Sequence, residues 1–132
     1  MPHKNMISLG DFMPSDHWQT HINSIFYGIK GPEIHNHFQT YVSLDYRLAH
    51  ALANNFFSRA RSQQRPLSNK WVVQEWGVGN GNLAACFLSR LREIDKDDEV
   101  YPFVYYILCD ESEEILKGVR SNSRLLEHTG KF

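Results

Sequence analysis

The chain has 132 residues and nearly balanced charge, with 14 Lys and Arg against 15 Asp and Glu. This length suits one domain with a buried core, and the charge balance provides no basic field for nucleic acid. No stretch approaches the roughly 20 apolar residues of a membrane span, and residues 1–10 lack a signal-peptide run, so we expect a soluble cytoplasmic protein. Cys86 and Cys109 fall in expected core segments, which favours a reducing compartment.

The first part of the chain is expected to be irregular and then helical. Residues 1–20 show no hydrophobic period, and residues 17–27 have near-helical spacing over too short a run to assign before Gly28 breaks it. Apolar residues then recur at three- and four-residue steps, which predicts an amphipathic helix from about 33 to 61, with room for an interruption near Ser43. The recurring residues are Ile34, Phe38, Tyr41, Val42, Leu48, Leu52, Phe56 and Phe57.

The second part is expected to alternate strands and helices. The expected elements are a strand at 71–75, a helix at 82–94, a strand at 103–109 and a helix at 112–126. The continuous apolar run of the second strand is typical of a strand buried on both faces of a parallel sheet, and the charged run 95–99 indicates a solvated loop. We therefore expect an α/β protein in which residues 1–69 form an irregular and helical segment and residues 70–132 form a βαβα unit.

A glycine-rich turn separates the first expected strand from its helix. After Glu75, glycine occupies the alternate positions Gly77, Gly79 and Gly81. Glycine accepts positive φ and leaves the backbone open to a ligand, and the amides that begin the next helix add donors and partial positive charge. Asp110 follows the second strand, and ligands of parallel sheets bind beyond the carboxyl ends of the strands. The pattern predicts a cradle for a nucleotide or nucleoside.

Several alternatives follow from the same residues. A phosphate-binding P-loop requires Lys and then Ser or Thr after its last glycine, and Asn82 with Leu83 excludes it. A dinucleotide fingerprint requires glycine where Asn82 stands, so a nicotinamide-dependent enzyme stays open only as a variant. A purely structural strand-to-helix turn is the third alternative. Asp110 by itself would also suit a helix N-cap with Glu113 three residues later, and one carboxylate could serve both roles.

The chain has an acidic residue, one spacer and Gly-x-Gly-x-Gly, and then a second acidic residue after the next strand. These features resemble motifs I and II of class I S-adenosylmethionine-dependent methyltransferases. In that family the glycine turn lets the backbone approach the cofactor. The motif I acid serves the methionine end, and the second acid binds the ribose hydroxyls. The resemblance implies that S-adenosylmethionine is bound by Glu75, Gly77, Gly79, Gly81, Asn82, Asp110 and Glu111.

Two flanking segments narrow the resemblance. Asp110-Glu111-Ser112 is similar to the "acid, any residue, Ser" signature of the MidA-like methyltransferases, and Pro32-Glu33-Ile34 with Phe38 is similar to their Pro-Glu-Ile segment. These enzymes are bacterial relatives of the mitochondrial complex I assembly methyltransferase, which modifies a protein arginine. The resemblance implies a Rossmann-like fold and a protein side chain, such as arginine, as methyl acceptor. No residue can be named as the general base.

The expected elements amount to only part of a class I methyltransferase. The strands that would carry the adenine-binding and substrate-side segments are not among them. We therefore expect an N-terminal portion of such an enzyme, with its sheet completed by a partner chain or by a missing C-terminal segment. The alternative is a non-catalytic interaction or assembly module derived from, or completing, such an enzyme.

Histidine pairs provide a weaker signal. His17 and His21 are four residues apart, and His35 and His37 flank Asn36, so a metal is conceivable. No third and fourth ligand stand at a recognisable spacing, and we expect no metal site.

Overall fold

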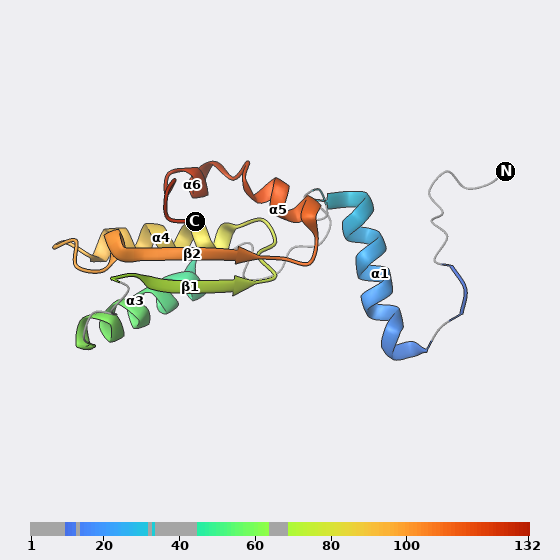
Figure 1. The fold of residues 1–132 in the computed structure, drawn as a ribbon, viewed down its shortest axis with the longest axis horizontal. Coiled ribbons are helices and arrows are strands. Elements are labelled where there is room, and N and C mark those ends of the chain that lie inside the picture. The colour runs from blue at the N-terminus through green and yellow to red at the C-terminus, as the bar shows by residue number, and fades with distance from the viewer. Residues whose placement is uncertain (1–9, 13, 32, 34–44, 64–68) are drawn as a thin grey trace.

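The structure is a computed structural model that describes residues 10–12, 14–31, 33, 45–63 and 69–132 (Figure 1). Its elements in chain order are α1 (Ser15–Lys30), α3 (Arg47–Ser62), β1 (Trp71–Trp76), α4 (Asn82–Ile94), the 3-10 turn η2 (Tyr101–Phe103), β2 (Val104–Cys109), α5 (Glu113–Val119) and α6 (Ser123–Leu126). The expected bounds of β1, α4 and β2 are confirmed to within one residue. No helix among the described residues is long and apolar enough to cross a membrane.

The two strands form a parallel sheet. Trp71 lies opposite Val104, and Trp76 lies opposite Cys109, so both strands point the same way in Figure 1. The α4 helix makes the crossover connection that a parallel pair requires. This mixed arrangement of helices and a two-stranded parallel sheet agrees with the α/β expectation. Because parallel strands end at the same edge, the residues that follow β1 and those that follow β2 meet there.

Small residues bring α3 and α4 together. Ala49 and Ala53 of α3 are fully buried and Ala60 nearly so, and the facing helix α4 also buries alanines and leucines. The small alanine side chains of α3 let the two helix backbones approach closely. The stripe expected to face inward is therefore wrong in part, since Leu48 and Leu52 are 38% and 45% exposed.

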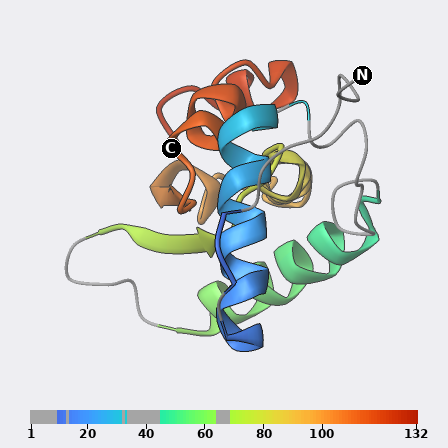
Figure 2. The ribbon, with the colours of Figure 1, turned by 90° about the vertical axis from the view of Figure 1, so that its right-hand side faces the viewer.

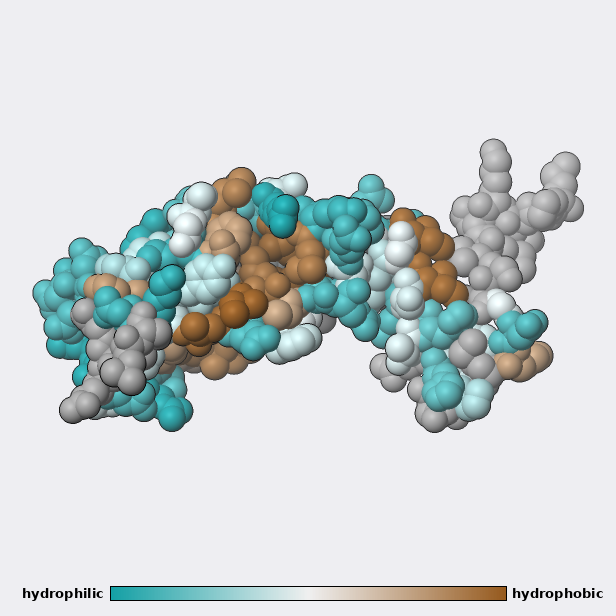
Figure 3. Space-filling view, viewed as in Figure 1, coloured by the Kyte–Doolittle hydropathy of each residue, from teal (hydrophilic) through white to brown (hydrophobic). Residues whose placement is uncertain are grey.

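The helices cover one face of the sheet and leave the other face open. Figure 2 shows the strands on one side of the molecule, with α3 and α4 on the other. The open face carries Val72, Trp76, Tyr105 and Ile107, all at least 37% exposed. Figure 3 shows hydrophobic side chains gathered over the strands on this face. The expectation that β2 is buried on both faces is therefore wrong, because every described helix that packs on the sheet does so from the other side.

The expected helix over 112–126 is interrupted. The side chain of Asn122 accepts hydrogen bonds from the amides of Arg124 and Leu125, at 3.0 and 3.2 Å, and caps α6. An asparagine side chain competes for backbone amides, so the chain turns and begins a new helix. The turn moves Leu125 into the core and leaves Leu126 49% exposed.

The chain after α6 returns to the sheet. The amide of Tyr106 donates to the carbonyl oxygen of Lys131 at 2.6 Å, on the edge of β2 that faces away from β1. Phe132 packs against the core. The segment around Lys131 thus begins to cover the outer edge of β2.

The N-terminal expectations are corrected at two places. Residues 15–20, expected to be irregular, belong to α1, which continues through Gly28 and ends at Gly31 with φ 50°. A glycine inside a helix costs only about 1 kcal/mol relative to Ala, whereas a left-handed residue ends the helix. Figure 1 shows α1 at the end of the molecule next to α5.

Within the described residues, the later part of the expected helix over 33–61 is α3, which follows a non-helical stretch at Asp45 and Tyr46, close to the interruption allowed for near Ser43. Asp45 accepts from the amide of Arg47 at 2.7 Å, and α3 begins at Arg47. A short polar side chain that binds an amide two residues ahead favours a turn over a continuing helix. The part of the expectation that falls on residues 34–44 lies outside the described residues, as do Pro32 and the histidines at 35 and 37.

The charged run after α4 is only partly solvated. Asp95 is 4% exposed, and its carboxylate accepts from the amides of Glu99, Val100 and Tyr101 at 3.0, 2.9 and 2.6 Å. Three hydrogen bonds from backbone amides to one carboxylate hold the loop closed and offset the cost of burying the charge. The solvated-loop expectation is therefore wrong for Asp95, while the other residues of 95–99 are exposed.

Candidate functional site

The glycine turn is tied to the end of β2. The amides of Gly77 and Val78 both donate to the carbonyl oxygen of Cys109, at 2.8 and 3.2 Å. This carbonyl belongs to the last residue of β2, so the turn after β1 lies directly beside the segment that begins with Asp110. Two parts of the sequence that were expected to meet at one sheet edge are in contact.

All three glycines of the turn have left-handed backbone angles. Gly77, Gly79 and Gly81 have φ values of 73°, 56° and 77°, which L side chains rarely adopt. A Cβ added at Gly77 would meet nothing within 4 Å, so this glycine borders open space. A Cβ at Gly81 would lie 3.1 Å from Cγ1 of Val119. Gly77 thus leaves room for a ligand, whereas Gly81 also allows α5 to pack against the turn.

The first turn of α4 presents backbone donors at the same edge. The side chain of Asn80 accepts from the amide of Asn82 at 3.0 Å, and the carbonyl oxygen of Asn80 accepts from Nδ2 of Asn122 at 2.8 Å. In the part of the chain that the structure describes, the amides of Leu83 and Ala84 have no hydrogen-bond acceptor. Such amides at a helix start suit an oxygen-bearing ligand.

Asp110 bridges the two segments. Its Oδ2 accepts a long hydrogen bond of 3.5 Å from the amide of Gly79, and its Oδ1 accepts from the amide of Ser112 at 3.0 Å. The N-cap of α5 is Ser112, whose Oγ accepts from the amide of Ile115. The alternative interpretation of Asp110 as the N-cap is therefore wrong. An ionised carboxylate has about four acceptor positions, so Asp110 retains capacity for a ligand hydroxyl. Glu111, beside it, is exposed.

Glu75 is partly buried and has one described side-chain partner. Its Oε2 accepts a hydrogen bond of 2.8 Å from the hydroxyl of Tyr106, which is 3% exposed. Burial raises the pKa of Glu75 to about 7, although the hydrogen bond from Tyr106 opposes this effect. Burial and the neighbouring Glu75 raise the pKa of Tyr106. Glu75 consequently changes its charge near neutral pH. Carboxyl groups with a strongly shifted pKa are often found at functional sites.

The structure brings most of the expected site residues to one edge. Glu75, the glycine turn and Asp110 lie at the carboxyl ends of β1 and β2, with Asn82 at the start of α4. Sequence reasoning missed Tyr106 as the partner of Glu75, because a tyrosine in an apolar strand carries no local sign of what its hydroxyl meets. Trp76, between Glu75 and Gly77, is 76% exposed on the open face.

Among the described residues, no group of three or more His, Cys, Asp and Glu side chains is arranged to hold a metal ion. His17 and His21 both lie on α1, and the ring of His21 packs edge-on against Trp18. Both cysteines are free thiols in the structure. Comparisons of the chain with protein-family models, with curated proteins and with solved structures found no match. The functional assignment therefore depends on the residues of this site.

Proposed function

We propose that this chain is the cofactor-binding portion of an S-adenosylmethionine-dependent methyltransferase. The main support is the juxtaposition of three left-handed glycines with Asp110, which accepts from the amide of Gly79. Residues 75–82 and 109–112, which form this turn and the segment beside it, contain Glu75, Asp110 and Glu111 but no Lys or Arg. Acidic groups repel a phosphate and attract a cation, and they accept hydrogen bonds from hydroxyls. This favours a cationic nucleoside over a phosphorylated dinucleotide.

Each site residue has a role that its position permits. The two oxygens of Asp110 suit the two hydroxyls of a ribose, and Gly77 and Gly79 let the ligand approach the backbone. Above pH 7, where it is mostly ionised, Glu75 provides negative charge for the ammonium at the methionine end, and Asn82 and Glu111 flank the cradle. S-adenosylmethionine supplies an electrophilic methyl group on its sulfonium. The contribution of the chain is orientation of that methyl for attack by the acceptor.

The acceptor and the remaining parts of the enzyme are proposed from the resemblance to MidA-like methyltransferases. The acceptor is a protein side chain, with arginine as the specific proposal. The Rossmann-like sheet would be completed by a partner chain or a further C-terminal segment, and the general base would come from there. The open face supports this view because parallel sheets normally have both faces covered. The outer edge of β2, which Lys131 only begins to cover, supports it because a sheet edge is normally paired or covered.

Calorimetric titration with S-adenosylhomocysteine tests the proposal. We expect binding to the chain, a loss of at least tenfold in affinity with Asp110→Asn, and no binding with Gly79→Arg. Asparagine retains the acceptor for the amide of Ser112, so Asp110→Asn should fold normally. Glu113→Gln, which changes an exposed carboxylate two residues from Glu111, should bind like the unchanged chain. Absence of binding, tighter binding of NAD, or indifference to Asp110→Asn would contradict the proposal.

A second candidate function is a non-catalytic interaction or assembly module. The specific observation in its favour is the open sheet face with Val72, Trp76, Tyr105 and Ile107. An apolar patch of this kind is typical of a surface that another protein covers. The two functions are separated by analytical ultracentrifugation and a methylation assay. A monomeric, cooperatively folded chain that methylates a protein would exclude the assembly function.

A further inference from the structure

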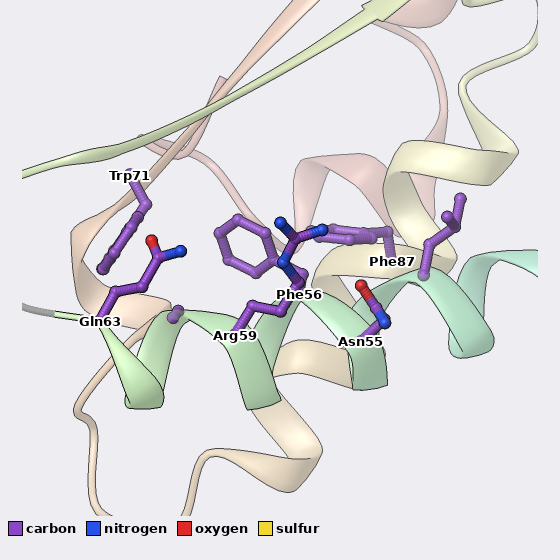
Figure 4. Close-up of a pocket in the computed structure, with 8 residues that line it drawn as sticks. Asn55, Phe56, Arg59, Gln63, Trp71 and Phe87 are labelled. Atoms are coloured by element: carbon purple, nitrogen blue, oxygen red, sulfur yellow. The ribbon is translucent and has the colours of Figure 1, made fainter.

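A pocket lies between α3, β1 and α4, away from the glycine turn. Its volume is about 400 Å³, within the usual range for small-molecule sites. Figure 4 shows the rings of Phe56, Trp71 and Phe87 along it. Phe56 meets Trp71 and Phe87 edge to face, with ring centroids 6.2 and 5.6 Å apart. The pocket therefore has a rigid aromatic wall built from three different elements.

One wall of the pocket is polar and cationic. Asn55, Arg59 and Gln63 follow one another at four-residue steps along α3 and its end, and all three line the pocket (Figure 4). In the described part of the chain, Arg59 forms no ion pair, whereas Arg61 in the same turn pairs with Glu99 at 2.8 Å. Two amide side chains and a guanidinium with no ion-pair partner among the described residues thus border an aromatic pocket.

We propose that this pocket binds a small carboxylic acid with an aromatic or branched apolar body. A guanidinium matches a carboxylate through two parallel N–H donors, and the neighbouring amides of Asn55 and Gln63 supply further donors. The aromatic walls remove the apolar body from water. The pocket begins at Trp71, the first residue of β1, whereas the glycine turn follows the last residue of this strand. The two sites are therefore separate, and this inference does not depend on the proposed function.

The test is an NMR titration of the 15N-labelled chain with 1-naphthaleneacetate and with its neutral analogue 1-naphthaleneacetamide. The two probes have the same ring and nearly the same size, so they differ chiefly in charge. We expect saturable shifts of the indole N–H of Trp71 with the acid, and binding of the amide at least tenfold weaker. The indole N–H of Trp76, which lies at the other end of β1, serves as the internal reference.

Two arginine variants test whether Arg59 causes the preference for the charged probe. Arg59→Gln should weaken binding of 1-naphthaleneacetate about tenfold and leave binding of the amide unchanged. Arg61→Gln removes an arginine of the same helical turn that does not line the pocket, and it should bind both probes like the unchanged chain. Equal affinity for the two probes, an undiminished affinity in Arg59→Gln, or shifts at Trp76 in place of Trp71 would overturn the inference.

Discussion

The hydroxyl of Tyr106 donates a 2.8 Å hydrogen bond to Oε2 of Glu75 across the two strands of the sheet. Both side chains lie on the face that the helices cover, and the ring of Tyr106 packs edge-on against Phe87 of α4. Glu75 lies two residues before Gly77, so its hydrogen bond with Tyr106 links the start of the glycine turn to β2. Because the pKa of Glu75 is about 7, the charge at the cradle depends on pH in the neutral range.

Glu75→Gln should stabilise the chain at alkaline pH. Glu75 ionises near pH 4.5 in the unfolded chain and near pH 7 when folded. The folded state therefore holds a proton that the unfolded state has released, and its relative stability falls as pH rises from 4.5 to 7. Glutamine resembles the neutral carboxyl. Its advantage in the free energy of unfolding should grow by about 2 kcal/mol between pH 5 and pH 8, measured by urea denaturation. A difference that does not change with pH would contradict this.

Tyr106→Phe should lower the stability of the chain, and this loss should grow with pH, whereas Glu75→Gln should bring a gain that grows with pH. Removal of the hydroxyl leaves the carboxylate of Glu75 without its donor, which raises the pKa of Glu75 further and penalises the ionised form. We expect a loss of about 1–3 kcal/mol at pH 8 and a smaller loss at pH 5, by the same denaturation experiment. Tyr105→Phe, on the open face and 43% exposed, is the matched control and should cost much less at either pH.

The glycines of the turn should differ in their sensitivity to alanine. Gly77→Ala introduces a left-handed alanine into open space and should lower stability by about 1–2 kcal/mol from backbone strain alone. Gly81→Ala has the same strain and also brings a Cβ to 3.1 Å from Val119, so it should lower the melting temperature more. Thermal unfolding followed by circular dichroism gives the melting temperatures of the two variants. A lower melting temperature for Gly77→Ala than for Gly81→Ala would refute this packing explanation.

His128 should contribute a pH dependence of opposite sign to that of Glu75. The ring is 1% exposed, with Nε2 at 2.9 Å from Oγ of Ser89 and Nδ1 at 2.7 Å from the hydroxyl of Tyr101. Burial lowers the pKa of His128 below its usual 6.5, so the unfolded chain takes up a proton first, and stability falls as pH drops below 6.5. In a Glu75→Gln background this fall should be visible between pH 7 and pH 5.

The control for His128 is a second substitution in the same background. His128→Gln should flatten the dependence of the unfolding free energy on pH, because glutamine does not titrate. Ser89→Ala tests the contact itself and should cost about 1–3 kcal/mol at pH 7, since it leaves a buried ring nitrogen without its partner. Ser123→Ala, at an exposed position, should leave stability nearly unchanged. A fall of equal size after His128→Gln would assign the effect to another group.

Local signals in the sequence predicted the elements that position the candidate site. The β-branched run of β1, the apolar stripe of α4 and the alternate glycines between them depend on backbone sterics and on neighbours within a few residues. The same holds for Asp110 at the end of an apolar strand. These elements were therefore predictable without any knowledge of distant contacts, and so was the meeting of Asp110 with the glycine turn once the strands were taken as parallel.

Only the tertiary structure decided what each side chain meets. An apolar strand does not reveal which of its faces a distant helix will cover, so the open face of β2 and the burial of Glu75 against Tyr106 were not predictable. The break at Asn122 and the alanine face of α3 depended likewise on competition between local preference and packing against α4. The sequence by itself thus determined the order of the elements and the backbone of the cradle, because these follow from local sterics and periodicity. The partners and charge states within it were decided by contacts between residues some thirty positions apart.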